Sequence, residues 1–194
     1  MEPAVQTDRK LAAIMFTDII SYSQMTSKNE KNALSILKEH NSLLNEQFNK
    51  HNGNVIKQTG DGFLTEFPSA LESVNGAIAI QNSLYIHNST QELDDRINIR
   101  IGIHLGDIVK TENDDILGDG VNIASRIEAH SEPNGGGVCF SQQIYDQVVN
   151  KINYDIESIG KKKLKGTTKP YELYRVMLPI QKSDIRSVGE RKVQ

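Results

Sequence analysis

Residues 55–67, Val-Ile-Lys-Gln-Thr-Gly-Asp-Gly-Phe-Leu-Thr-Glu-Phe, hold two short apolar runs on either side of a glycine-flanked aspartate. Val55–Ile56 and Phe63–Phe67 have the composition of β-strands, and residues 59–62 (Thr-Gly-Asp-Gly) are of the kinds that tight turns favour. The stretch therefore predicts a β-hairpin with Asp61 at its tip.

Helix and strand patterns lie on both sides of this hairpin. Upstream, Leu11–Phe16 is a continuous apolar run typical of a buried strand, and residues 32–50 carry apolar side chains at helical spacing. Downstream, Pro68 opens a second helix, and residues 97–103 alternate apolar and polar side chains as a strand does. The inner face of that second helix is expected to hold Ala70, Val74, Ala77, Ile78 and Leu84. The order strand, helix, hairpin, helix, strand is that of a split βαβ unit of the ferredoxin-like kind.

The remaining sequence adds elements to that core. Residues 107–110 predict a short strand of their own, a helix is expected from Asp119, and Val138–Phe140 predicts another strand. Ser141 is expected to cap a further helix. Two closing strands are expected at residues 152–159 and 171–177. We therefore expect an α+β fold: a ferredoxin-like βαββαβ core with additional C-terminal strands and a helix, in which helices cover the sheet.

The chain is expected to form one domain, because internal repeats and linker-like stretches are not evident in it. Its 194 residues are 37% hydrophobic and 24% charged, which suits a globular domain with a core of ordinary size. We expect the domain to cover residues 10–177, after a flexible N-terminus at residues 1–9 and before a polar tail at residues 178–194.

Charge, cysteine content and hydropathy bear on the partners and the compartment to be expected. The net charge of -3 gives no reason to expect nucleic acid or an anionic membrane surface as a partner. The single cysteine, Cys139, cannot form an intrachain disulfide, which favours a reducing, cytoplasmic compartment. No stretch reaches the roughly 18 apolar residues that a membrane helix needs, so no membrane segment is expected.

Two aspartates stand where predicted strands end. Asp18 follows the apolar run 11–16, and Asp61 is the hairpin tip. Taken singly, Asp18 is explained as a strand-end residue and Asp61 as a favoured turn residue. A pair of carboxylates at neighbouring strand ends also suits Mg²⁺ or Mn²⁺, which prefer oxygen ligands and keep positions open for water and phosphates. Two such ions can lower the pKa of an attacking hydroxyl and neutralise charge on a leaving oxygen. The two residues alone leave both explanations open.

Several motifs follow one another along the chain. They are FTDIISYS at residues 16–23, KQTGDGF at 57–63, RIGIHLG at 100–106, GDGVNIASRIE at 118–128 and, near the end, LKG at 164–166 with PYELY at 170–174. In their order and spacing these motifs resemble the class III adenylate and guanylate cyclase family. The resemblance covers about residues 10 to 177 and implies a nucleotidyl cyclase catalytic domain.

The resemblance implies a metal site and a base-reading pair. Asp18 and Asp61 would bind two ions of Mg²⁺ or Mn²⁺, with the backbone carbonyl of Ile19 as a further ligand. Lys57 and Asp115 match the positions that read the purine. A lysine donates to a ring nitrogen, and a carboxylate accepts from the amino group of adenine, where guanine presents a carbonyl instead. This pair therefore predicts ATP as the substrate, although an acidic run such as the one that holds Asp115 is ordinarily a solvated loop.

Asn122 and Arg126 lie four residues apart and so share one face of the predicted helix. By resemblance, Asn122 orients the ribose and Arg126 stabilises charge on the phosphoryl group in the transition state, where a guanidinium contacts two oxygens at once. Without the family motif, Arg126 would be assigned to a surface ion pair with Glu128 or Asp119. Lys165 matches the family lysine that holds the terminal phosphates.

One position departs from the family pattern. Some relatives place an arginine just after the Gly-Ile-His-x-Gly strand to contact the outer phosphates, and this chain has Asp107 there. Arg100 or a lysine would have to substitute, or the contact is absent. His104, within that strand, is expected to be a structural side chain rather than a ligand.

The resemblance further implies a homodimer with two shared active sites. The metal-binding aspartates of one copy would face the base-reading, ribose-binding and phosphate-binding residues of the other. The sequence thus predicts an adenylate cyclase that converts ATP to 3′,5′-cyclic AMP and pyrophosphate by two-metal-ion catalysis. A guanylate or dual-specificity cyclase, and a non-catalytic cyclase-like module that binds nucleotide or a partner, are the alternatives.

Overall fold

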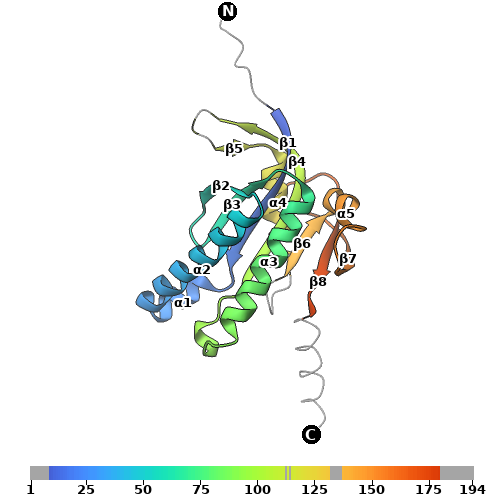
Figure 1. Cartoon of the computed structure of the whole chain (residues 1–194). Coiled ribbons are helices and arrows are strands. Elements are labelled where there is room, and N and C mark those ends of the chain that lie inside the picture. Colours follow the sequence, from blue (N-terminus) through green and yellow to red (C-terminus); the bar gives the residue numbers. More distant parts are fainter. Residues whose placement is uncertain (1–8, 112, 114, 132–136, 180–194) are drawn as a thin grey trace, which may run out of the picture.

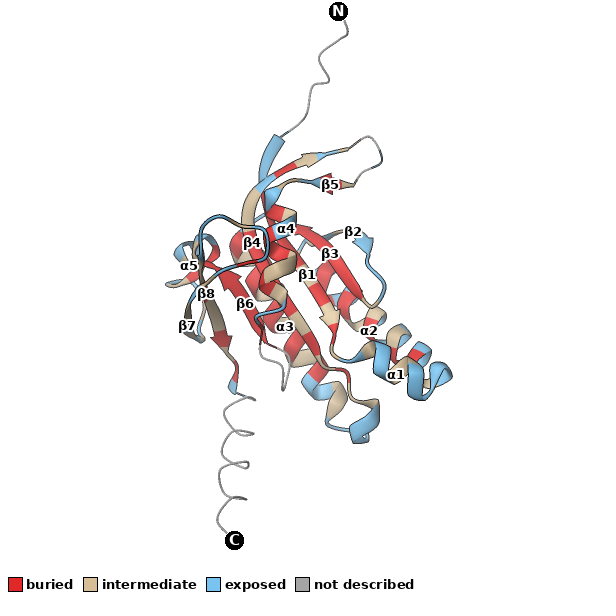
Figure 2. Cartoon of the chain, turned by 180° about the vertical axis from the view of Figure 1, so that it is seen from behind, coloured by how far each residue is buried: buried red, intermediate tan, exposed pale blue. Residues whose placement is uncertain are grey.

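The central strand, β1 (Arg9–Ile19), shows how the sequence builds two cores. Ala13 and Met15 pack into one apolar cluster, whereas Ala12 and Ile14 pack into another, because successive side chains of a strand point to opposite faces. Both faces of the sheet are therefore covered, and its central strands are buried (Figure 2). The computed structural model describes residues 9–111, 113, 115–131 and 137–179.

The described strands form one mixed sheet (Figure 1). Besides β1 they are β2 (Asn54–Gln58), β3 (Gly62–Phe67), β4 (Ile99–Lys110), β5 (Ile116–Leu117), β6 (Val138–Ser141), β7 (Asp155–Lys162) and β8 (Tyr171–Met177). The sheet order is β2-β3-β1-β4-β6-β8-β7, and β5 pairs with β4. The paired strands are antiparallel except β4 and β6, which run parallel. The expected ferredoxin-like α+β core is confirmed, and the hairpin expected at residues 55–67 is β2 and β3.

Helices lie on both faces of this sheet. α2 (Glu30–Lys50) and α3 (Ala70–Asn88) cross one face with α5 (Gln142–Val148) beside α3, and α4 (Asp119–Glu128) covers the other (Figures 1 and 2). A short helix, α1 (Tyr22–Lys28), joins β1 to α2, and the 3₁₀ helix η1 (Leu93–Asp95) precedes β4. The predicted inner face of α3 is buried as expected: Ala70, Val74, Ala77, Ile78 and Leu84.

Two long helices begin at residues that cap them. The Asn29 side chain accepts a hydrogen bond from the Asn32 backbone N–H at the start of α2. Ser69 does the same for the Glu72 N–H at the start of α3. Each cap satisfies a backbone donor that the first helical turn leaves free.

β4 corrects the sequence prediction. The strands expected at residues 97–103 and 107–110 are one continuous strand, β4, in which Gly102 and Gly106 serve packing rather than a turn. A Cβ atom at Gly102 would lie 2.2 Å from the backbone nitrogen of Glu128, and one at Gly106 would lie 2.9 Å from the Cα of Gly120. The two glycines let α4 rest directly on the backbone of β4.

Three further details differ from the sequence prediction. The helix α1 and the two-residue strand β5 were not expected, because each is too short to show a periodic pattern. Ser141 stands at the start of α5, but its hydroxyl does not cap that helix. Its Oγ lies 2.8 Å from Nδ1 of the buried His104 instead.

The ends of the expected domain fall partly on residues outside the described ones. The predicted flexible stretch and polar tail concern mainly residues 1–8 and 180–194, which the structure does not describe. Arg9 is the first residue of β1, and Leu178 packs against the core with 2% of its surface exposed. Among the described residues, no helix is long and apolar enough to cross a membrane.

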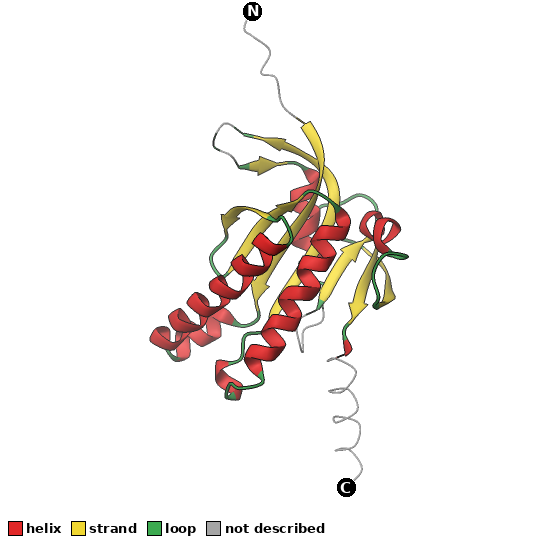
Figure 3. Ribbon diagram, in the orientation of Figure 1, coloured by secondary structure: helices red, strands yellow, loops and turns green. Residues whose placement is uncertain are grey.

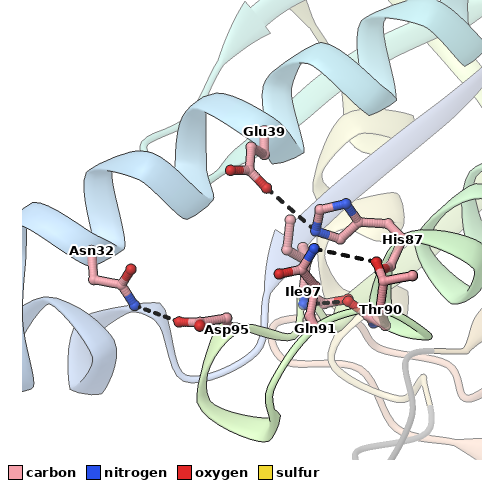
Figure 4. Close-up of polar contacts among 8 residues, drawn as sticks. Asn32, Glu39, His87, Thr90, Gln91, Asp95 and Ile97 are labelled. Atoms are coloured by element: carbon pink, nitrogen blue, oxygen red, sulfur yellow. Dashed lines mark hydrogen bonds and ion pairs between the residues drawn. The ribbon is translucent and has the colours of Figure 1, made fainter.

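The loop between α3 and β4 is tied to α2 and fixes where β4 begins (Figure 4). The Asn32 side chain donates to Asp95 at 2.8 Å, and His87 Nε2 lies 3.4 Å from the Glu39 carboxylate. The Asn88 amide both donates to the Ile97 carbonyl at 2.9 Å and accepts from its N–H at 2.8 Å. These contacts set the position of the first residues of β4.

Beyond the helices, β4 and β5 extend as an arm of the sheet together with the start of β1 (Figure 3). The arm matters for the site because its far end carries Asp115, just before β5.

Candidate active site

The ends of β1, β3 and β4 bring the two predicted metal-binding aspartates together. Asp18 lies opposite Gly62 of β3 on one side and opposite Arg100 of β4 on the other, and Asp61 precedes Gly62 at the hairpin tip. A Cβ atom at position 62 would lie 1.8 Å from the carbonyl oxygen of Thr17. Only glycine lets the hairpin tip approach β1 this closely.

Arg100 lies between carboxylates from two different elements. Its Nη2 donates to Asp18 Oδ2, and its Nε lies 2.7 Å from Glu128 Oε1. Glu128 is the last residue of α4, and the close packing of that helix on Gly102 places it there. We call Asp18, Asp61 and Glu128, grouped around Arg100, the carboxylate corner.

The sequence prediction included the two aspartates of this corner but not its other members. Glu128 had no site role in that prediction, and Arg100 was suggested as a replacement for the outer-phosphate arginine. The Arg100 guanidinium is instead engaged by two carboxylates of its own chain. Their place in the sequence could have indicated a role in the site, because Arg100 is the first residue of the RIGIHLG motif and Glu128 is the last residue of the GDGVNIASRIE motif.

The corner holds more acidic than basic side chains, and the pKa values of two of its acids are raised. Burial and the nearby charge of Asp18 raise the pKa of Asp61 above its usual value. Burial raises the pKa of Glu128 to about 7; Arg100 opposes this rise, and the two aspartates add to it. Carboxyl groups shifted in this direction are stabilised in their charged form by an added cation.

The donor set of the corner suits a hard divalent cation. Carboxylate oxygens are the ligands that Mg²⁺ and Mn²⁺ prefer, and Asp18 keeps 31% of its side chain exposed. Within the described residues, no three His, Cys, Asp or Glu side chains are placed to hold an ion by themselves. The remaining ligands would therefore be water, backbone oxygen or substrate phosphate, as is usual for Mg²⁺. Ile19, the predicted backbone ligand, is the last residue of β1 and has a buried side chain.

Lys57 and Asp115 meet although 58 residues separate them in sequence. The Lys57 Nζ donates to both carboxylate oxygens of Asp115, at 2.6 and 2.8 Å. The Ile116 N–H donates to the same carboxylate, and the Thr111 N–H donates to the Asp115 carbonyl, which closes the turn before β5. The hydrogen bond from Lys57 is the main cause that holds the pKa of Asp115 below its usual range. The two predicted base-reading residues thus form one pair, from β2 and from the arm.

A third group of predicted residues lines a hollow of about 450 Å³ beside α4, which we call the α4 pocket. Asn122 and Arg126 project into it from α4, and Gly166 lies close to the Arg126 guanidinium. The residues that line the pocket are Asp119, Asn122, Ile123, Arg126, Gly166, Thr167, Thr168, Lys169 and Tyr171. Lys165 is exposed in the turn between β7 and β8, next to this lining rather than within it. Lys169 and Tyr171 line the pocket and were not predicted, although Tyr171 belongs to the PYELY motif and Lys169 directly precedes it.

Comparison with known proteins agrees with this arrangement. Residues 5–177 match the family described as the adenylate and guanylate cyclase catalytic domain. The chain belongs to this family. The putative adenylate cyclase 3 of Rhizobium meliloti (strain 1021) is 36% identical over 167 residues, which cover 86% of this chain. The chain spans only 28% of the length of that relative.

Solved structures show the same cyclase fold. The adenylate/guanylate cyclase/hydrolase from Silicibacter pomeroyi is 32% identical and superposes with a TM-score of 0.81, covering 89% of this chain and 99% of that one. The adenylyl cyclase CyaB from P. aeruginosa superposes with a TM-score of 0.79 at 24% identity, covering 90% of this chain and 97% of that one. The sheet order and the positions of its helices are therefore those of a cyclase catalytic domain.

Within this cyclase domain, the predicted site residues form three separate groups. The α4 pocket is lined by neither Asp18 nor Asp61, nor by the Lys57–Asp115 pair. His104 lies buried beneath α4, where burial lowers its pKa to about 4 and its ring packs edge-on against Tyr171. These contacts agree with the expected structural role for His104. Asp107 is exposed on the arm.

Proposed function

We propose that this cyclase domain is an adenylate cyclase that converts ATP to 3′,5′-cyclic AMP and pyrophosphate. The observation that carries the proposal is the Lys57–Asp115 pair, formed between β2 and the arm. Adenine offers a ring nitrogen to a lysine and an amino group to a carboxylate. Guanine offers a carbonyl in place of the amino group, so a carboxylate facing it would lose its hydrogen bond.

Lys57 and Asp115 are hydrogen-bonded to each other when no base lies between them. Both side chains are partly exposed, at 44% and 35%, so they can part without breaking core packing. On binding adenine, each would exchange one hydrogen-bond partner for another, and the Ile116 N–H would continue to hold the carboxylate in place.

The proposed reaction is an intramolecular displacement. The ribose 3′-hydroxyl loses its proton and attacks the α-phosphorus, and the bond to the pyrophosphate oxygen breaks as the new bond forms. No covalent enzyme intermediate is required. Asn122 would orient the ribose, Arg126 would stabilise the charge that develops on the α-phosphoryl oxygens, and Lys165 would hold the departing phosphates.

Two Mg²⁺ or Mn²⁺ ions, when bound, would lower the pKa of the attacking hydroxyl and neutralise charge on the leaving oxygen. Asp18 and Asp61 would hold them, with the backbone carbonyl of Ile19 as a further ligand. The excess of carboxylate over guanidinium charge in the corner supports this assignment.

We further propose that the active enzyme is a homodimer with two shared sites. The separation of the carboxylate corner from the α4 pocket supports this, because one ATP must reach both kinds of residue. In a twofold dimer, the corner of one copy would face the α4 pocket and the Lys57–Asp115 pair of the other.

A direct assay tests the proposal. Purified protein is incubated with ATP or GTP and with Mg²⁺ or Mn²⁺, and cyclic nucleotide and pyrophosphate are quantified. We expect cyclic AMP and pyrophosphate in equal amounts, and little cyclic GMP. Equal turnover of ATP and GTP would indicate a dual-specificity cyclase, and no turnover of either would indicate a non-catalytic module.

A further inference from the structure

The Arg100 guanidinium joins a strand end to a helix end. Asp18 and Arg100 are direct cross-strand neighbours on β1 and β4, so their side chains leave the sheet on the same face. From there, Arg100 Nη2 reaches Asp18 and Arg100 Nε reaches Glu128, at 2.7 Å. Asp18 accepts a hydrogen bond from Arg100, whereas Glu128 forms a close ion pair with it that lacks hydrogen-bond geometry. A guanidinium can pair with two carboxylates at once because its charge is spread over a planar group.

Of the two carboxylates that contact Arg100, that of Glu128 is the more buried and the more rigidly held. Its side chain is 14% exposed, against 31% for that of Asp18. The backbone at Glu128 is fixed as well, since its carbonyl accepts from both the N–H and the hydroxyl of Ser131, at 3.0 and 2.8 Å. Glu128 therefore holds Arg100, and Arg100 in turn holds one oxygen of Asp18.

From this geometry we propose that Arg100, held by Glu128, is a positioning residue that orients the Asp18 carboxylate for divalent cation binding. The proposal rests on the proposed role of Asp18 as a metal ligand. A carboxylate with one oxygen fixed by a donor has its direction set before a cation arrives, so less freedom is lost when the cation binds. Loss of such a supporting partner typically weakens metal binding about ten- to a hundredfold.

If Arg100 has a different role, its removal should change the cation affinity in a different way. If Arg100 acted only as a counter-ion that occupies Asp18, its removal would leave more negative charge in the corner and would tighten cation binding. If Arg100 acted only on stability, its removal would lower the melting temperature and leave the affinity of the folded protein for a cation unchanged. Measurement of cation affinity therefore separates the three roles.

The test measures Mn²⁺ binding to the full chain without nucleotide, from the electron paramagnetic resonance signal of free Mn²⁺, alongside thermal unfolding. We expect Arg100→Gln to weaken Mn²⁺ binding by about tenfold or more. Arg100→Lys, which keeps the charge but cannot span both carboxylates, should give a smaller loss. Lys38→Gln removes the same charge from an exposed position on α2 and should leave Mn²⁺ affinity unchanged.

Mn²⁺ affinity that is unchanged or tighter in folded Arg100→Gln would overturn the proposal. If that variant does not fold, Glu128→Ala frees Arg100 from its anchor, and unchanged Mn²⁺ affinity there would overturn it equally. The variants Asp18→Asn and Asp61→Asn distinguish failure of the positioning role from failure of the proposed metal site. If both abolish Mn²⁺ binding while the Arg100 variants do not alter it, only the positioning role fails. If wild type and Asp18→Asn bind Mn²⁺ alike, or if wild type binds none, the proposed metal site fails and the positioning role fails with it.

Discussion

The carboxylate corner and the α4 pocket, two regions of the same chain, differ in how their charges are held. In the corner, Arg100 contacts Asp18 near the end of a strand and Glu128 at the end of a helix, and Asp61 lies close by at the hairpin tip. In the α4 pocket, the basic side chains of Arg126 and Lys169 outnumber the acidic one of Asp119 in the lining of an open hollow of about 450 Å³. An acidic corner suits cations, and a basic hollow suits phosphate oxygens. The chain thus keeps apart the two kinds of group that would bind the metal ions and the phosphates in the proposed reaction, as the proposed site shared between two copies requires.

The largest expected effect tests whether the two regions work together across a dimer. Asp18→Ala breaks the corner and Arg126→Ala breaks the pocket, and each should lower cyclase activity by about a hundredfold or more. Mixed in equal amounts, the two should recover about a quarter of the wild-type rate, because half of the dimers are mixed and each mixed dimer has one intact site. The rate of cyclic AMP formation measures this. Failure to recover, with both variants folded and dimeric, would contradict the shared site.

A second prediction concerns the Lys57–Asp115 pair, which belongs with the pocket in the proposed site. Asp115→Ser removes the acceptor for the adenine amino group and should lower the ratio of kcat/KM for ATP to that for GTP by roughly ten- to a hundredfold. Competition kinetics with both nucleotides measure the ratio. Glu46→Ser, which removes an exposed carboxylate from α2, is the control and should leave the ratio unchanged. An unaltered ratio in Asp115→Ser would contradict the base-reading role.

A third prediction breaks the corner without touching the pocket. Gly62→Ala would place a Cβ atom 1.8 Å from the Thr17 carbonyl oxygen, so the hairpin tip must move. We expect a loss of about 3 kcal/mol in the free energy of unfolding, measured by urea denaturation. Gly60→Ala is the matched control two residues away. Nothing lies within 4 Å of its Cβ, so only its positive φ of 72° opposes alanine, which costs about 1 kcal/mol. Equal losses in the two variants would show that the close approach at Gly62 does not matter.

The smallest effect concerns the strand face beneath α4. The pKa of His104 is lowered to about 4 by burial, from an ordinary value of 6.5. The unfolded chain therefore binds more protons than the folded one between these values, and stability falls as the pH drops through that window. We expect His104 to account for about 2 kcal/mol of the stability lost between pH 7 and pH 5.

Urea denaturation of wild type and His104→Gln at both pH values measures this contribution. The variant should lose less stability than the wild type over the same interval, whatever its stability at pH 7. An equal loss would show that His104 is not held neutral in the folded state.

The sequence predicted well what depends on local pattern. The hairpin of residues 55–67 and the buried face of α3 follow from apolar periodicity and turn residues, and both are present. It wrongly divided β4 into strands at residues 97–103 and 107–110; Gly106, between them, makes room for a helix from elsewhere in the chain. Such packing is invisible to any local pattern.

The site shows the same limit. Asp18, Asp61, Asn122 and Arg126 lie in recognisable motifs, whereas the meeting of Arg100 with Glu128 depends on how α4 sits on β4. The Lys57–Asp115 contact likewise depends on pairing between β4 and β5, and β5 has only two residues, too few to show a periodic pattern.

The contact of α4 with Gly102 and Gly106 has a mechanical consequence. Backbone rests on backbone there, so Arg126, Glu128 and Arg100 move as one rigid body with the central sheet. In the proposed dimer, a signal could not move α4 relative to β4 without breaking this contact. If the proposed dimer is regulated, the change would then lie in how its two subunits are placed relative to each other, which sets the distance between the corner of one and the α4 pocket of the other.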